Sequence, residues 1–281
     1  MDTSAIADAF DTRIDDALFW VSDNLAFLFD GLRALFEGFY DGVLGLLGLA
    51  PWFVVVLILG AIAWRLVGRP FGLFATIALA ACWLMGLWPE TISTFALVLS
   101  ATFLALLLAI PIGVFAGLLP GLDRLVEPVL DLIQTLPPYI YLLPAIALLG
   151  FGPATALAAT LIVAMPPAIR LTSLGIRATP VNFVELGQAT GMTPAQMFWK
   201  IRLPFALSSI MAGINQSLMM AFGMVVIAGI VGSGGLGEAI YNAIRTLDIG
   251  KSIDAAIAIV ILTIVIDRVT QSFVKTGKDT A

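Results

Sequence analysis

The feature that most constrains this chain is a series of long segments without Asp, Glu, Lys or Arg. A helix needs about 20 apolar residues to cross the hydrocarbon core of a bilayer, and most of these segments reach that length. The last segment is weaker, because its uncharged part lies between Asp254 and Asp267; we expect Asp267 and Arg268 to reach the headgroups there. The segments are 42–64, 70–89, 91–122, 132–169, 203–237 and 252–270.

Segment 132–169 is long enough for two spans and carries a turn signal, Gly-Phe-Gly-Pro at 150–153, near its middle. Seven membrane-spanning helices are therefore predicted. The composition agrees, since 60% of the residues are hydrophobic and 12% are charged, against roughly 45–50% and about 25% in soluble domains. The predicted class is an all-α polytopic membrane protein.

The distribution of Lys and Arg predicts the orientation, because loops on the cytoplasmic side carry an excess of positive charge. If segment 178–202 is cytoplasmic and the spans alternate from there, ten of the 14 Lys and Arg residues fall inside and four outside. The opposite orientation would reverse this bias. The N-terminus is therefore expected outside and the C-terminus inside.

The first 40 residues follow a different pattern. Apolar residues recur there at helical spacing, while Asp16, Asp23, Asp30 and Glu37 repeat every seven residues on another face. The pattern predicts either an amphipathic helix on the outer membrane surface or a helix packed against the spans or a partner chain. The apolar positions are Ile14, Val21, Leu25, Leu28, Leu32, Leu35 and Phe39.

The residue inventory excludes several kinds of chemistry. The chain has no His and a single Cys, Cys82, so nucleophile pairs with His and His metal sites are excluded, and no metal or cofactor is expected. The near match to a P-loop, Gly-Lys-Ser at 250–252, has Arg245 where that motif needs its first glycine. An ion-coupled secondary transporter stays open as an alternative, although the charge-free runs lack the carboxylate that usually marks an ion-coupling site.

Residues 182–204 lie between two long apolar runs and carry the signals of two short helices. Asn182 followed by Glu185 resembles a capping box, and Gly191 is a typical C-terminal stop. A second start follows at 193–196, with Thr as N-cap, Pro at the first helical position and Gln at the third. The segment is too polar to cross the membrane and too well specified for a slack loop.

The same segment carries apolar side chains that we expect to be exposed. An exposed apolar surface rimmed by polar groups is typical of a docking site. The alternative is a connector whose apolar residues pack against the bilayer or the neighbouring spans. These residues are Phe183, Val184, Leu186, Met197, Phe198 and Trp199.

The spacing in this segment resembles the EAA loop of ABC importer permeases: Glu185 is followed by Gly191, Ile201 and Leu203–Pro204 at that pattern's intervals. Its two alanines are Leu186 and Gly187 here, and glycine is expected to loosen the helix by roughly 0.5–1 kcal/mol relative to alanine. The stretch IMAGINQSLMMAFGMVVIAGIVGSGGLGEAI and the later LDIG extend the resemblance, over about residues 91–270, to the glycine betaine/proline betaine/choline branch of that family.

The resemblance implies an ABC type I importer permease core at 91–270 with a coupling loop at 178–203. Outside that range, the charge-free runs and the charge bias predict an N-terminal amphipathic external segment at 1–44, two accessory membrane helices at 45–90 and a cytoplasmic tail at 271–281. The ATPase-coupling residues carried over from the family are Glu185, Leu186, Gly187, Gly191, Ile201, Leu203 and Pro204.

The resemblance also implies the surroundings of the chain. The expected location is the bacterial inner membrane, in a permease homodimer that works with a cytoplasmic ABC ATPase and an extracytoplasmic substrate-binding protein. The chain itself is then not an enzyme, its other partner is the lipid bilayer, and no nucleic-acid partner is expected. The expected solute is glycine betaine or proline betaine, with choline as the nearest alternative.

Polar residues inside 203–237 provide candidates for a translocation pathway. Ser208 and Asn215 lie seven residues apart and share one helix face, which Met211 and Met219 flank. Polar groups in hydrocarbon face the protein interior or a water-filled cavity, so this face is predicted either to line the pathway or to bond neighbouring helices. In addition, Tyr139 and Tyr141 are predicted to offer a ring face to a quaternary ammonium group.

Three glycines at the end of the same run, Gly232, Gly234 and Gly237, satisfy the G-x-G-x-x-G pattern. A dinucleotide site needs a strand before these glycines, whereas this stretch follows an apolar helix pattern. It is predicted to be an external turn that lets the end of the span flex.

Overall fold

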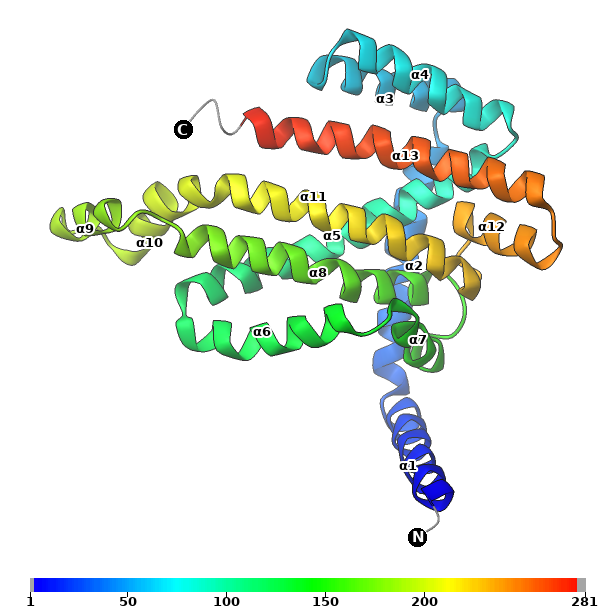
Figure 1. Cartoon of the computed structure of the whole chain (residues 1–281), viewed down its shortest axis with the longest axis horizontal. Helices are drawn as coiled ribbons and strands as arrows, with labels where there is room; N and C mark the ends of the chain where they lie inside the picture. Colours follow the sequence, from blue (N-terminus) through cyan, green and yellow to red (C-terminus); the bar gives the residue numbers. More distant parts are fainter. Residues whose placement is uncertain (1–2, 277–281) are drawn as a thin grey trace.

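The protein is entirely helical over the residues that the computed structural model describes, 3–276. Long helices lie side by side in one bundle, and two shorter helices, α9 and α10, project from one end of it (Figure 1). The helices of eight or more residues are α1 (Thr3–Asn24), α2 (Ala26–Gly48), α3 (Trp52–Leu66), α4 (Arg69–Leu84), α5 (Trp88–Leu118), α6 (Pro120–Thr135), α7 (Leu142–Leu149), α8 (Pro153–Arg177), α9 (Val181–Ala189), α11 (Leu203–Ala228), α12 (Gly235–Arg245) and α13 (Ile249–Thr276).

Four continuous helical segments among the described residues are long and apolar enough to cross a membrane. They are α5, α8, α13 and the helical run Pro194–Val231, which contains α10 (Pro194–Met197) and α11. The number rises to six if each of two bent helix pairs forms one span. The all-helical membrane class is confirmed, and the seven spans predicted from the sequence are reduced to four to six.

The first bent pair replaces the predicted continuous span 42–64. Helix α2 ends at Gly48 and α3 begins at Trp52, and the two axes differ by 94°. Pro51 lies at the break and is the N-cap of α3. Because proline has no backbone N–H, this residue could not donate a hydrogen bond to α2 if that helix continued. A proline also disfavours the helical conformation of the residue before it, so the helix cannot run through this position.

The second bent pair replaces the predicted span over the first half of 132–169. Helix α6 ends at Thr135, a short 3₁₀ turn covers Pro138–Tyr141, and α7 follows after a bend of 106°. Leu136 and Pro137 both precede a proline and are both extended, with ψ angles of 137° and 135°. This extended backbone, which a following proline favours, ends α6 here. In α8, by contrast, Pro166 and Pro167 are accommodated within a continuous helix.

Helix α6 lies along α8 (Figure 1), and two of its acidic side chains pair with arginines of that helix. Arg177 is paired with Asp123 and Arg170 with Asp131, and the hydroxyl of Ser173 donates to Asp123 at 2.9 Å. The exposed surface of α6 is mixed. Arg124 and Glu127 are exposed, and so are the large apolar side chains of Leu125, Val129 and Leu132.

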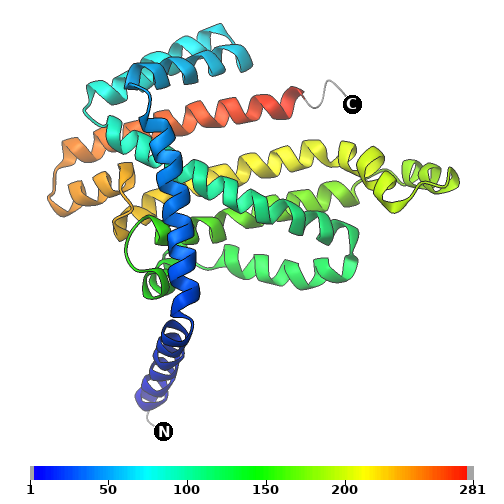
Figure 2. The same ribbon diagram turned by 180° about the vertical axis from the view of Figure 1, so that it is seen from behind.

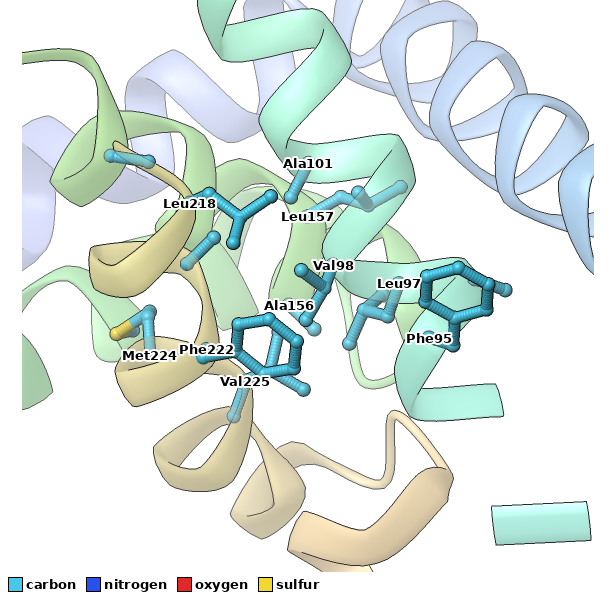
Figure 3. Close-up of a cluster of buried hydrophobic side chains, with 14 of the residues drawn as sticks. Phe95, Leu97, Val98, Ala101, Ala156, Leu157, Leu218, Phe222, Met224 and Val225 are labelled. Atoms are coloured by element: carbon cyan, nitrogen blue, oxygen red, sulfur yellow. The ribbon is translucent and has the colours of Figure 1, made fainter. Parts of the chain in front are cut away.

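The core lies where α5, α8 and α11 pack together (Figure 3). Small residues at four-residue spacing on α5 allow this close approach, which is typical of helix pairs in membranes. A Cβ atom on Gly113 would lie 2.7 Å from the carbonyl oxygen of Ile169, and one on Gly117 would lie 2.8 Å from Cβ of Ile176. The small buried residues of this stripe are Ala101, Ala105, Ala109, Gly113 and Gly117.

The N-terminal helices take a different direction from the spans. Helix α2 crosses the bundle and α1 continues beyond its edge (Figure 2). Phe36 and Tyr40 of α2 are buried, and the Tyr40 hydroxyl lies 2.7 Å from the hydroxyl of Ser93 on α5. Of the two arrangements predicted for this region, packing against the spans holds for α2, and a membrane-surface position for α1 stays a prediction.

Candidate functional site

The first short helix, α9, begins differently from the prediction. It starts at Val181 with Pro180 as N-cap and without a side-chain cap, so the predicted capping box of Asn182 and Glu185 is wrong. Proline before the first turn supplies the extended start instead, since its φ angle is fixed and its missing N–H would have no partner there. Glu185 is exposed and makes no ion pair within the described residues.

The stop at Gly191 is confirmed, and its geometry is a complete Schellman motif. The N–H of Met192 donates to the carbonyl of Gly187 at 2.9 Å, and the N–H of Gly191 donates to the carbonyl of Gln188 at 3.0 Å. Gly191 has a φ angle of 71°, in the left-handed region that a side chain with a Cβ atom disfavours. The turn between the two short helices therefore depends on this glycine.

The second start is also confirmed. The Thr193 hydroxyl accepts from the N–H of Gln196 at 3.3 Å, and the Gln196 side chain accepts from the N–H of Thr193 at 3.0 Å, which completes a capping box. Pro194 occupies the first turn of the helix, as expected. Two orphan donors are thus satisfied within four residues.

Helix α11 begins at Leu203–Pro204, but the chain is helical on both sides of this point. The helix runs through a π-helical turn, Phe198–Arg202, directly into α11, and the N–H of Leu203 donates to the carbonyl of Phe198. Pro204 has no N–H to donate, and the wider π turn just before it accommodates that loss. The second short helix and the span are therefore one continuous rod.

Gly187 lies where α9 contacts this rod, the continuous helix that begins at Pro194. It is buried, and a Cβ atom there would lie 2.6 Å from Cε of Met197 and 3.0 Å from Cδ1 of Ile201. The sequence predicted only that Gly187 would make α9 less stable. The structure shows that Gly187 also has a packing role: because it has no Cβ atom, α9 lies directly against the side chains of Met197 and Ile201. Gly187, Met197 and Ile201 thus fix the angle between the two parts of the loop.

The exposed apolar surface is narrower than predicted. Met197 and Ile201 are buried between the helices. Phe183 contacts Phe205 of α11 with 4.9 Å between the ring centroids and the rings tilted by 50°, and it stays 44% exposed. Leu186 and Trp199 remain open, with 58% and 66% of their surface exposed. We call these two residues the loop face.

Removing the hydroxyl of Thr193 is expected to destabilise the loop but not the bundle. Thr193→Ala loses the cap of the second helix, which is worth about 0.5–2 kcal/mol, whereas Thr193→Ser keeps it. Hydrogen exchange should become faster at the amides of 194–197 in the alanine variant and stay at the parent rate in α5 and α8. Equal exchange in both variants would contradict the capping role.

The candidate pathway residues lie on α11, and Ser208, Met211, Asn215 and Met219 are all half-buried. The side-chain amide of Asn215 donates to Asp267 of α13 at 3.2 Å, and Gln271 donates to the same carboxylate at 2.9 Å. Asp267 therefore faces the bundle and not the headgroups, which corrects the prediction for that residue. The bond from Asn215 agrees with the alternative that this face joins helices.

The two tyrosines have different environments. The Tyr141 hydroxyl donates to the carbonyl of Ile133 at 2.8 Å, so this side chain ties the 3₁₀ turn to α6. Tyr139 is exposed and lines a groove of about 740 Å³ between α1 and α7. The pathway role of these tyrosines and of the four residues on α11 stays a prediction.

The arrangement of α5, α8, α11 and α13 with a two-helix projection between α8 and α11 is the permease fold of ABC importers. A chain in the inward-facing structures of the MetNI methionine ABC transporter superimposes on 69% of this chain and 96% of its own length, with a TM-score of 0.62 and 22% identity. The chain belongs to the family of binding-protein-dependent transport system inner membrane components, which its residues 109–276 match. It is a non-catalytic multi-pass permease of the inner membrane, whose partners are an ATPase and a substrate-binding protein.

Three relatives align over most of this chain. It is 39% identical to the glycine betaine transport system permease protein OpuAB of Bacillus subtilis, over 95% of this chain and 93% of the relative. The glycine betaine/carnitine transport permease protein GbuB of Listeria monocytogenes is 39% identical, over 89% and 94%. The glycine betaine/proline betaine transport system permease protein ProW of Escherichia coli is 36% identical, over 93% and 74%.

Proposed function

We propose that this chain is the membrane subunit of an ATP-driven importer for a quaternary ammonium compatible solute, glycine betaine or proline betaine. The similarity to permeases of this substrate class supports the proposal, since the relatives named for glycine betaine align with about nine-tenths or more of this chain. Choline is the nearest alternative, because the choline transport system permease protein OpuBB of Bacillus subtilis is 36% identical over 61% of this chain.

We propose that the segment 178–203 is the coupling loop and lies on the cytoplasmic side, with the N-terminus outside and the C-terminus inside. The excess of Lys and Arg that this orientation places inside supports it. Two copies of the chain would form the permease dimer around the pathway. Residues 277–281 of the predicted cytoplasmic tail lie outside the described residues, and 271–276 continue α13.

The coupling role is supported by the loop face: Leu186 and Trp199 are exposed on helices whose positions are fixed. The Schellman turn, the capping box and the Gly187 contact fix α9, and the continuous rod joins the loop to α11. A force on the loop face is therefore transmitted along α11 into the bundle. Glu185 would be available for a polar contact at the rim, whereas Gly187, Gly191, Ile201, Leu203 and Pro204 would hold the shape.

The coupling role is tested by placing charge on the loop face. The double variant Leu186→Glu/Trp199→Glu should lose most of the ATPase that co-purifies with the parent chain, because charged groups replace the apolar contact. The matched double variant Leu186→Met/Trp199→Phe keeps the apolar character and should retain the ATPase. Equal ATPase recovery from the two variants would show that the loop face is not part of the interface with the ATPase.

The substrate is tested by uptake into proteoliposomes that contain this chain, its ATPase and its binding protein. ATP-dependent uptake of labelled glycine betaine is expected, with unlabelled proline betaine competing strongly. Competition by unlabelled choline at the same concentration tests whether choline is a substrate. Uptake that needs an ion gradient and no ATP would overturn the importer proposal in favour of secondary transport.

A further inference from the structure

The end of α11, helix α12 and the turn before α8 pack against one another. They lie at the end of the bundle opposite to α9 and α10 (Figure 1). Helix α12 packs backbone to backbone on the end of α11: a Cβ atom on Gly229 would lie 2.2 Å from the carbonyl carbon of Gly237, and one on Gly237 would lie 2.7 Å from the carbonyl oxygen of Val225. The N–H of Gly152, before α8, donates to the carbonyl of Val231 at 3.0 Å. The glycine stretch 232–237 thus contains the predicted turn, but Gly237 at its end is tightly packed.

Further hydrogen bonds fix the start of α12. The Glu238 carboxylate accepts from the N–H of Gly234 at 2.7 Å, and the hydroxyl of Thr94 on α5 accepts from the N–H of Leu236 at 2.7 Å. Ser233 donates to the carbonyl of Ala228 at 3.1 Å. The position of α12 relative to α5 and α11 is thus determined by close contacts and directional bonds.

A cavity of about 320 Å³ lies between these fixed segments. The turn at 151–152 and the turn at 229–232 form part of its wall, and α12 forms the rest. The α12 residues that line it are spaced three, four and seven positions apart, so they share one helix face. They are Glu238, Tyr241, Asn242 and Arg245.

Opposite charges stand at the two ends of this face. Glu238 and Arg245 are seven residues apart, which places their backbones about 10 Å from each other along the helix axis. Between them lies Tyr241, with the Arg245 guanidinium 5.7 Å from its ring centroid. Arg245 makes no ion pair within the described residues.

The remaining wall adds a second aromatic ring and a helix end. Phe151 lines the cavity and is 69% exposed. Gly152, also in the wall, is the N-cap of α8, and the N-terminus of a helix carries a partial positive charge that favours anions. The cavity thus offers a carboxylate and aromatic rings for a cation, and a guanidinium and a helix N-terminus for an anion.

We propose that this cavity is a substrate-receiving site for a small zwitterion that carries a quaternary ammonium group and a carboxylate. The ammonium group lies against Glu238 and the Tyr241 ring, because methylated ammonium groups bind ring faces and carboxylates without needing hydrogen-bond donors. The ligand carboxylate pairs with Arg245. The volume is at the small end of ligand sites, as a solute of this size requires. The inference rests on the proposed function and assigns part of the recognition to this chain.

The test separates the two ends of the ligand. Binding of glycine betaine and of tetramethylammonium, which has no carboxylate, is measured calorimetrically on the purified permease–ATPase complex without the binding protein. Arg245→Gln should weaken glycine betaine at least fivefold and leave tetramethylammonium within twofold. Glu238→Gln, which retains an acceptor for the N–H of Gly234, should weaken both. Lys251→Gln removes an exposed cation outside the cavity and should change neither.

Three results would overturn the inference. If the parent complex with its binding protein imports glycine betaine but neither ligand binds the permease directly, the cavity is not a substrate site. If Arg245→Gln and Glu238→Gln reduce uptake only through weaker association of the binding protein, the cavity is a contact for that protein. If the parent transporter imports no betaine at all, the proposed function fails first, and the inference fails with it.

Discussion

Replacing Gly191 by Val is expected to uncouple transport while leaving the bundle folded. Gly191 has a φ angle of 71° and its Schellman hydrogen bonds close the turn between α9 and the second short helix. A β-branched residue in this conformation costs about 1–2 kcal/mol or more. A change of one or two kcal/mol shifts a two-state ratio by a factor of about 5–30, so fewer loops would keep the arrangement that presents the loop face.

The measurement is ATP-dependent uptake of glycine betaine together with recovery of the ATPase on the tagged permease. Both should fall in Gly191→Val, by at most the roughly five- to thirtyfold change in that ratio. Gly191→Asn is the matched control, because Asn tolerates the left-handed region better than other residues with a side chain. A Cβ atom meets no neighbouring atom within 4 Å at this position, so backbone conformation and not crowding is being tested. Normal uptake in Gly191→Val would show that coupling does not need this turn.

Gly113→Leu is expected to prevent the bundle from assembling. At this position α5 approaches α8 so closely that a Cβ atom would lie 2.7 Å from both the Ile169 carbonyl oxygen and Cβ of Thr172. These atoms belong to the backbone and to the stiff base of a β-branched side chain, so the helices themselves must separate. Overpacking of a core costs about 1–3 kcal/mol and occasionally more, and here the displaced helix contributes much of the buried core.

Gel filtration of the detergent-extracted protein measures the outcome. Gly113→Leu should give little monodisperse protein, whereas Gly223→Leu should behave as the parent, because Gly223 lies in α11 with no atom within 4 Å of a Cβ position. Both variants replace glycine by leucine, so they differ in how closely other atoms surround the substituted position. Equal yields of the two variants would mean that the small-residue stripe on α5 is not needed for packing against α8.

Much of the site could be predicted from local sequence signals. Gly191 and the residues 193–196 define their turn and cap by interactions within a few residues, and both predictions are confirmed. The helical membrane class follows from charge-free runs in the same way, because burying charge in hydrocarbon is expensive wherever it occurs. The spacing of Glu185, Gly191 and Leu203–Pro204 was sufficient to identify the family to which the comparison assigns the chain.

Predictions that depended on distant partners were less accurate. The number of spans was overestimated, since apolar composition does not reveal that Pro51 and Pro137–Pro138 end helices inside charge-free runs. Asp267 was placed at the headgroups because its partner, Asn215, lies 52 residues away. The glycines at 232–237 suggested flexibility, and only the structure shows that a Cβ atom on Gly237 would meet the end of α11 and one on Gly235 would meet Thr94 of α5.

The sequence alone therefore determined what acts over one or two helical turns: the membrane class, the turn at Gly191, the cap at Thr193 and the family spacing. The tertiary structure decided which helices bend, which acids of α6 pair with arginines of α8, and which residues of the loop remain exposed. It also brought Glu238, Tyr241 and Arg245 to the turns before α8 and after α11, around one cavity. The physical reason is that hydrogen bonds within a turn are set by neighbouring residues, whereas burial and cavities are set by packing between segments far apart in the chain.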